Sequence, residues 1–185
     1  MRKTGYYFVF FLLVAVQMLI CNYLNLSAWL MLSILPVMIL CVPLRLPTFW
    51  TMLLAFATGC AVDLLAEGHL GLNALALVPV AFVRKEVTRL IFGGELFARK
   101  EDFSVRKNGF GKVALAVFLV QALFLAVYIW ADGAGTRPFS FNAIRFGVSL
   151  VAGWAVSLLI IDIRAPDTRK GPPTPDTPVS SSAWE

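Results

Sequence analysis

The chain has 185 residues, of which 59% are hydrophobic and 15% are charged, and its mean hydropathy is +0.78. Soluble globular proteins average about 45–50% apolar and about 25% charged residues, so these values exclude an ordinary water-soluble domain. The net charge of +5 does not indicate a nucleic-acid-binding protein, because no basic patch with stacking aromatic residues lies on a soluble module. The length suffices for about six membrane-crossing helices with short loops. We therefore expect a single all-α polytopic membrane domain over residues 1–163.

Six apolar segments predict six transmembrane helices. The first segment follows Arg2 and Lys3 and has the outline of a signal peptide, but no small-residue cleavage site follows it, so we interpret it as a retained helix. In the second segment, Pro36 is expected to kink the helix. The fourth is short and contains Pro79, so a re-entrant segment is the alternative there. The predicted helices cover residues 6–21, 26–42, 48–65, 71–83, 113–131 and 141–161.

The distribution of Lys and Arg predicts the orientation of these helices. With six crossings and a cytoplasmic N-terminus, fourteen of the sixteen basic residues lie on the cytoplasmic side, as the positive-inside rule requires. This arrangement predicts that both termini are cytoplasmic. It also places a basic connector, residues 84–112 with eight basic and four acidic residues, on that side. Residues 164–185 lack the apolar content to fold, and we expect a disordered cytoplasmic tail there.

The start of the basic connector has the pattern of an interfacial helix. Val87, Leu90 and Ile91 are spaced to form one apolar face among basic residues, which favours a helix lying on anionic lipid. A solvated connector and a docking site for a cytoplasmic protein are the alternatives. The candidate lipid or cytoplasmic contacts are Arg84, Lys85 and Arg89.

Polar residues within the apolar segments are candidates for a functional site. Asp63 lies about fifteen residues into the third predicted helix, in the outer third of the membrane, and Gly59 is four residues earlier on the same face. A glycine lets another helix approach closely, so the two residues predict a notch with a carboxylate beside it. We expect an ion pair or a shared hydrogen-bond network between Asp63 and Arg145. The alternative is that these residues only hold helices together. The candidate partner groove and polar cluster comprises Gln17, Gly59, Asp63, Gly71, Asn73 and Arg145.

The sequence offers little support for an enzyme. It contains one histidine, His69, and its three cysteines, Cys21, Cys41 and Cys60, lack the spacing of a metal site. No Gly-x-Ser-x-Gly motif and no glycine-rich nucleotide loop occurs. We therefore predict no catalytic residue, no metal and no cofactor.

The third and fourth predicted helices carry a family resemblance. The motif Gly59-x-x-x-Asp63-Leu64, followed by Gly71-Leu72-Asn73-Ala74-Leu75-Ala76-Leu77 and then by Ala81-Phe82-Val83-Arg84, resembles the MreD family of rod shape-determining proteins. Residues 99–103, Arg-Lys-Glu-Asp-Phe, are similar to a loop of members from Bacteroidetes-type bacteria.

The resemblance implies a noncatalytic inner-membrane scaffold of the bacterial cell-elongation and peptidoglycan-synthesis machinery. It implies association with an MreC-like bitopic protein and, through it, with MreB filaments, RodA and the transpeptidase partner of RodA. It also implies a six-helix fold similar to the substrate-binding subunits of energy-coupling-factor transporters. The alternative function is a small-molecule, vitamin-type binding subunit of such a transporter. Against that alternative, residues 8–14 are bulky, whereas the docking helix of such subunits usually has small residues.

Overall fold

The structure, a computed structural model, describes residues 10–19, 30–44, 46–67, 71–93, 109–133 and 138–164. These residues form helices and contain no strand, so the expected all-α class is confirmed for the described part of the chain. The helices are Phe10–Leu19, α2 (Leu35–Leu40), α3 (Thr48–Val62) with the π-helical turn η1 (Asp63–Glu67), α4 (Leu72–Phe92), α7 (Phe110–Asp132) and α8 (Phe139–Arg164).

Three helices among the described residues are long and apolar enough to cross a membrane. They are Thr48–Leu65, Phe110–Asp132 and Phe139–Ile161. A bilayer core about 30 Å thick needs about 20 apolar residues in a helix, and these three supply that length. The chain therefore has the character of a membrane protein, while the full set of six crossings stays a prediction.

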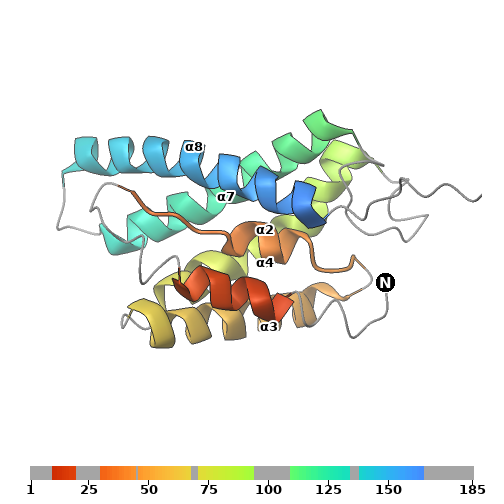
Figure 1. Ribbon diagram of the computed structural model, residues 1–185, viewed down its shortest axis with the longest axis horizontal. Coiled ribbons are helices and arrows are strands. Elements are labelled where there is room, and N and C mark those ends of the chain that lie inside the picture. The colour runs from red at the N-terminus through yellow and green to blue at the C-terminus, as the bar shows by residue number, and fades with distance from the viewer. Residues whose placement is uncertain are drawn as a thin grey trace, which may run out of the picture.

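Hydrogen bonds between elements give the register of the bundle. Trp154 Nε1 donates to the carbonyl oxygen of Ala114 at 2.9 Å, which sets the late part of α8 beside the start of α7. At the other end of the same pair, Arg145 of α8 bonds to Asp132 of α7. The two helices are therefore antiparallel. Figure 1 shows the end of α4, the start of α7 and the end of α8 at one end of the bundle.

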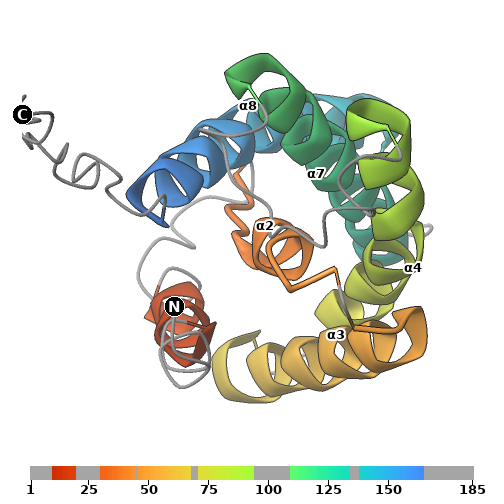
Figure 2. The same ribbon diagram turned by 90° about the vertical axis from the view of Figure 1, so that its right-hand side faces the viewer.

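The short helix α2 forms the centre of the core. Viewed along the bundle, it is surrounded by α3, α4, α7, α8 and the helix Phe10–Leu19 (Figure 2). All six of its residues are buried. They pack against buried apolar side chains of the surrounding helices, among them Leu77, Val117, Phe124 and Leu125. An apolar segment of this chain can therefore form the buried centre of the bundle, and not only a helix that faces lipid.

The prediction of one long helix over residues 26–42 is wrong in its described part. Residues 30–34 have no regular secondary structure, and the helix begins only at Leu35. Pro36 lies in the first turn of α2, where its missing N–H leaves no hydrogen bond unmade. Proline is favoured at the first positions of a helix, so Pro36 marks the start of a short helix rather than a kink in a long one. Residues 26–29 lie outside the described part of the chain.

The prediction that the fourth helix ends at residue 83 is also wrong. The helix α4 continues through Arg84 to Phe92, so the first nine residues of the predicted basic connector are helical. Residues 84–92 contain neither glycine nor proline, and the helix ends at Gly93, whose φ of +74° suits glycine. The predicted end was placed where the first charged residues begin. Charged residues change the polarity of a helix but do not end it.

The remaining predicted boundaries fall close to the observed helices. Residues 48–65 correspond to α3 with η1, and residues 113–131 and 141–161 lie within α7 and α8. The first predicted helix is seen as Phe10–Leu19. Residues 94–108 of the connector and residues 165–185 of the predicted tail lie outside the described residues.

Candidate functional site

The buried carboxylate of Asp63 holds the first turn of α4. Its Oδ2 accepts hydrogen bonds from the backbone N–H groups of Gly71 at 3.0 Å and Ala74 at 3.3 Å. Its Oδ1 accepts from the N–H of Asn73 at 3.1 Å and from Asn73 Nδ2 at 2.9 Å. The residue before α4 is Gly71, at φ +99°, which has no side chain to cap the helix. Asp63 supplies that cap from the neighbouring element, and its negative charge suits the positive end of the helix.

Gly59 brings the backbones of α3 and α4 into contact. A Cβ atom built at Gly59 would lie 2.4 Å from the Cα and 2.5 Å from the backbone nitrogen of Ala74. The predicted notch therefore exists but is filled by this chain's own α4, so the expectation that it receives a partner helix is wrong. Four of the six predicted residues, Gly59, Asp63, Gly71 and Asn73, meet at this one helix junction.

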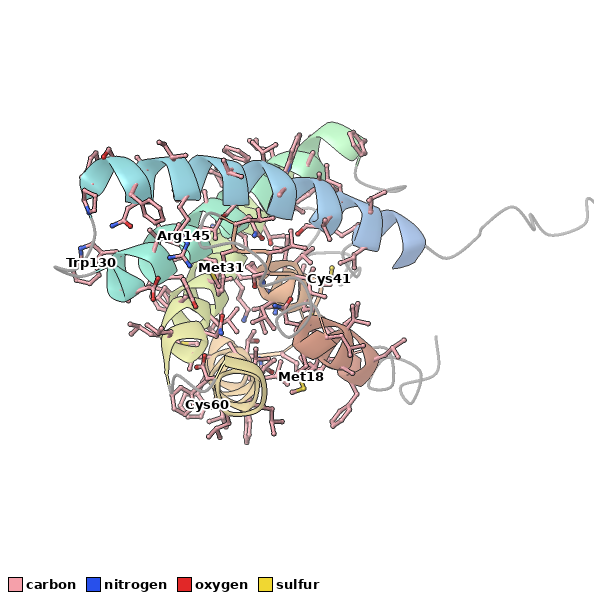
Figure 3. The ribbon with its side chains drawn as sticks, turned by 60° about the vertical axis from the view of Figure 1, so that its left-hand side comes forward. Met18, Met31, Cys41, Cys60, Trp130 and Arg145 are labelled. Atoms are coloured by element: carbon pink, nitrogen blue, oxygen red, sulfur yellow. The ribbon has the colours of Figure 1, made fainter. Side chains whose placement is uncertain are left out.

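The predicted ion pair between Asp63 and Arg145 is absent from the structure. Arg145 Nη1 donates to Asp132 Oδ2 in a salt bridge between α8 and α7. Figure 3 shows Arg145 next to these two helices and well apart from Cys60, which lies on α3 three residues before Asp63. The helix order explains the error, because α4 and α7 lie between α3 and α8 in the ring (Figure 2).

Gln17 belongs to a different polar contact, around the non-helical residues 30–34, which we call the clamped segment. Gln17 Oε1 accepts from the N–H of Ile34 at 2.8 Å, and its Nε2 donates to the carbonyl of Leu32 at 3.4 Å. Both groups belong to backbone that makes no helical bond there. A buried side-chain amide thus satisfies one donor and one acceptor of the clamped segment.

Two further helices bond to the clamped segment. Ser149 Oγ of α8 accepts from the N–H of Met31 at 2.9 Å, and Gln121 Nε2 of α7 donates to the carbonyl of Ser33 at 3.2 Å. Non-helical backbone at membrane depth is tolerated only where protein or enclosed water satisfies it. Gln121 and Ser149 were not among the residues predicted from the sequence. Gln121 carries a signal, because it is a polar residue in the middle of the otherwise apolar helix α7, whereas Ser149 is one of several polar residues along α8.

Gly153 makes room for Gln121. A Cβ atom at Gly153 would lie 2.4 Å from Gln121 Nε2, so α8 needs a glycine where the amide reaches the clamped segment. Ser157 follows one turn later on the same face and is also fully buried. Two atoms of this region, Gln121 Oε1 and Ser157 Oγ, have no hydrogen-bond partner among the residues that the structure describes.

The three predicted lipid contacts separate into one buried and two outer residues. Arg84 is 1% exposed, and its Nη2 donates to the carbonyl of Val42 at 2.7 Å, just beyond the end of α2. A guanidinium group suits the negative end of a helix, so Arg84 anchors α2 within the bundle. The expectation that Arg84 faces lipid is therefore wrong. Lys85 is half-buried and Arg89 is exposed.

Among the described residues, no group of three or more His, Cys, Asp or Glu side chains could hold a metal ion. His69 and Cys21 lie outside the described residues, while Cys41 and Cys60 are half-buried. Most of the buried polar side chains described above bond to backbone groups of the chain itself, namely Gln17, Asp63, Arg84, Gln121 and Ser149. This arrangement stabilises irregular backbone inside an apolar bundle.

Comparisons with known protein families, with curated proteins and with solved structures find no match for this chain.

Proposed function

We propose that this chain is a noncatalytic scaffold of the bacterial inner membrane that binds an MreC-like bitopic protein in the cell-elongation machinery. The observation that carries the proposal is the use of the buried polar side chains. Asp63, Gln17 and Gln121 bond to backbone groups of the chain, so their chemistry maintains a fixed shape. A rigid shape with an apolar exterior is what a scaffold in a membrane requires.

The family resemblance supports the same proposal, because its residues have a shared physical role. Gly59 permits contact between α3 and α4, and Asp63 caps α4 through Gly71 and Asn73. The residues at positions 59, 63, 71 and 73 are thus the ones that the hairpin of α3 and α4 requires. The proposal includes six crossings with cytoplasmic termini, an arrangement similar to energy-coupling-factor subunits, and indirect contact with MreB, RodA and its transpeptidase.

The outer face of α3 is the proposed contact for the partner's transmembrane helix. Large apolar side chains on this face and on the adjoining η1 turn are exposed in the described part of the chain, including Phe49, Trp50, Leu53, Phe56 and Leu64. Both flanks of α3 in the bundle are already occupied, by α4 and by the helix Phe10–Leu19 (Figure 2). A helix that packs on this face would leave the hairpin junction undisturbed.

Co-purification from a rod-shaped bacterium tests the proposal. We expect the tagged chain to retain an MreC-like protein and the double substitution Leu53→Ala with Phe56→Ala to reduce that retention several-fold. The control is Val151→Ala with Leu159→Ala, which removes exposed apolar side-chain atoms from α8 and should leave retention unchanged. Failure of the parent chain to retain the protein, together with normal rod shape after its depletion, would reject the scaffold function.

One observation favours the second candidate, a small-molecule binding subunit of a transporter. Gln121 Oε1 and Ser157 Oγ are buried and have no hydrogen-bond partner among the described residues, and Gln121 also bonds to the clamped segment. Discontinuous helices near the membrane midplane are where transporters bind substrates. A native mass spectrum of the purified chain distinguishes the two functions. A retained vitamin-sized ligand that is lost in Gln121→Leu would favour the transporter subunit.

A further inference from the structure

The exposed face of α4 changes character along its length. Leu75 and Phe82 project outward in the first half, at 54% and 62% exposure. Glu86, Arg89 and Leu90 continue the same face in the second half and are exposed as well. Their spacing of three, four and seven residues keeps them on one side of the helix. An apolar stripe therefore leads, past the exposed carboxylate of Glu86, to the exposed guanidinium group of Arg89.

The helix α7 repeats this pattern from its first turn. Lys112 is exposed, and Leu115 and Leu119, three and seven residues later, are exposed on the same face. A cation near a helix N-terminus is unfavourable for the helix dipole, and the first turn of α7 contains no acidic residue. Lys112 therefore does not stabilise α7 itself. Its position is suited to binding an anion outside the chain.

Both cations lie at the same end of the bundle. Figure 1 shows the end of α4 and the start of α7 together there, at the end where α2 leads into α3. Arg84 differs from Arg89 and Lys112, because it is turned inward to Val42. Arg89 and Lys112 are therefore available to bind a ligand outside the chain, and Arg84 is not.

We propose that Arg89 and Lys112 bind the headgroups of anionic phospholipids, with the acyl chains lying along the apolar stripes of α4 and α7. The cations lie on the sides of the helices, in line with exposed apolar residues, and not on the end surface alone. A lipid has this combination of a phosphate and an adjoining hydrocarbon chain. Long basic side chains at helix ends place their charge at the headgroup level while their stems contact apolar surface.

Lipid titration of the purified full-length chain in neutral detergent tests this proposal. The probes are phosphatidylglycerol and phosphatidylcholine, and native mass spectrometry counts the bound molecules. We expect phosphatidylglycerol to bind preferentially. A basic residue near an anionic lipid surface contributes about fivefold to binding, so Arg89→Gln with Lys112→Gln should weaken phosphatidylglycerol binding about fivefold at each of the two stripes. Binding of phosphatidylcholine should not change.

Charge and shape controls complete the test. Arg89→Lys with Lys112→Arg should retain the preference, and Glu86→Gln should retain or increase it, because it removes an exposed negative charge from the same face. All substituted residues are exposed or retain their charge, so thermal unfolding should match that of the parent chain. The proposal is overturned if the double Gln variant binds phosphatidylglycerol within twofold of the parent. It is also overturned if millimolar inorganic phosphate displaces the lipid, since that would indicate a soluble-anion site.

Discussion

Gly59 and Gly147 are both helical glycines, yet their surroundings are opposite. A Cβ atom at Gly59 would overlap the backbone of Ala74, whereas one at Gly147 of α8 would meet no atom within 4 Å. Backbone cannot rotate away as a flexible side chain can. At the residue scale, therefore, the distance between α3 and α4 depends on one missing methyl group.

The pair gives a matched stability prediction. Gly59→Ala should lower the free energy of unfolding by about 3 kcal/mol, because α4 must move away from α3. Gly147→Ala should leave it unchanged or raise it by up to about 1 kcal/mol through helix propensity. Thermal unfolding of both variants in the same detergent measures the difference. Equal melting temperatures would show that α3 and α4 do not touch at residue 59.

A second prediction concerns the carboxylate of Asp63. Asp63→Asn replaces one acceptor oxygen with an NH₂ group that faces backbone N–H donors, so it should cost about 3 kcal/mol of stability. Thr58→Val, one turn earlier on α3, removes a single bond from Thr58 Oγ1 to the carbonyl of Leu54 at 2.7 Å and should cost only about 1 kcal/mol. Chemical denaturation of the two variants checks this order. A smaller loss for Asp63→Asn would mean that capping of α4 does not need the charge.

At the scale of elements, the clamped segment explains how a helix as short as α2 can begin inside the bundle. Six residues cover about 9 Å of helix, far less than a membrane requires. The preceding backbone obtains its hydrogen bonds from Gln17, Gln121 and Ser149, which lie on three different helices. The irregular segment thus links helices that are distant in sequence.

A double-mutant cycle tests the contact of α7 and α8 at this segment. Gly153→Ala alone should destabilise the chain by about 2 kcal/mol, because its methyl group would displace the Gln121 amide from Ser33. In a Gln121→Ala background the same substitution should be close to neutral, since the side chain it would displace is gone. Additive effects in thermal unfolding would contradict this arrangement.

The helices were predictable from the sequence where a long apolar run begins and ends at the same residues as the helix. The long apolar runs gave α3, α7 and α8, because only a helix satisfies backbone groups in an apolar environment. The break before α2 was not predictable, because it depends on side chains from other helices that accept and donate at residues 31–34. For the same reason, the sequence placed Asp63 and Arg145 at one depth but did not reveal that α4 and α7 separate them.

At the scale of the whole molecule, the antiparallel order of α7 and α8 bears on the membrane topology. Lys112 is in the first turn of α7, and Phe139, 87% exposed, begins α8 beyond the opposite end of α7. If α7 crosses the bilayer, these two positions face different compartments. The positive-inside rule then assigns the cytoplasm to Lys112, together with Arg89 and Lys85.

Cysteine labelling of intact spheroplasts tests this assignment in a chain whose three natural cysteines are replaced by alanine. A membrane-impermeant maleimide should modify Phe139→Cys in intact cells and Lys112→Cys only after lysis, because charged reagents do not cross the hydrocarbon core. Both positions are exposed, so accessibility within the fold does not limit either reaction. Labelling of both in intact cells would show that α7 does not separate them. Labelling of Lys112→Cys alone would invert the topology and move the proposed lipid contacts to the outer leaflet.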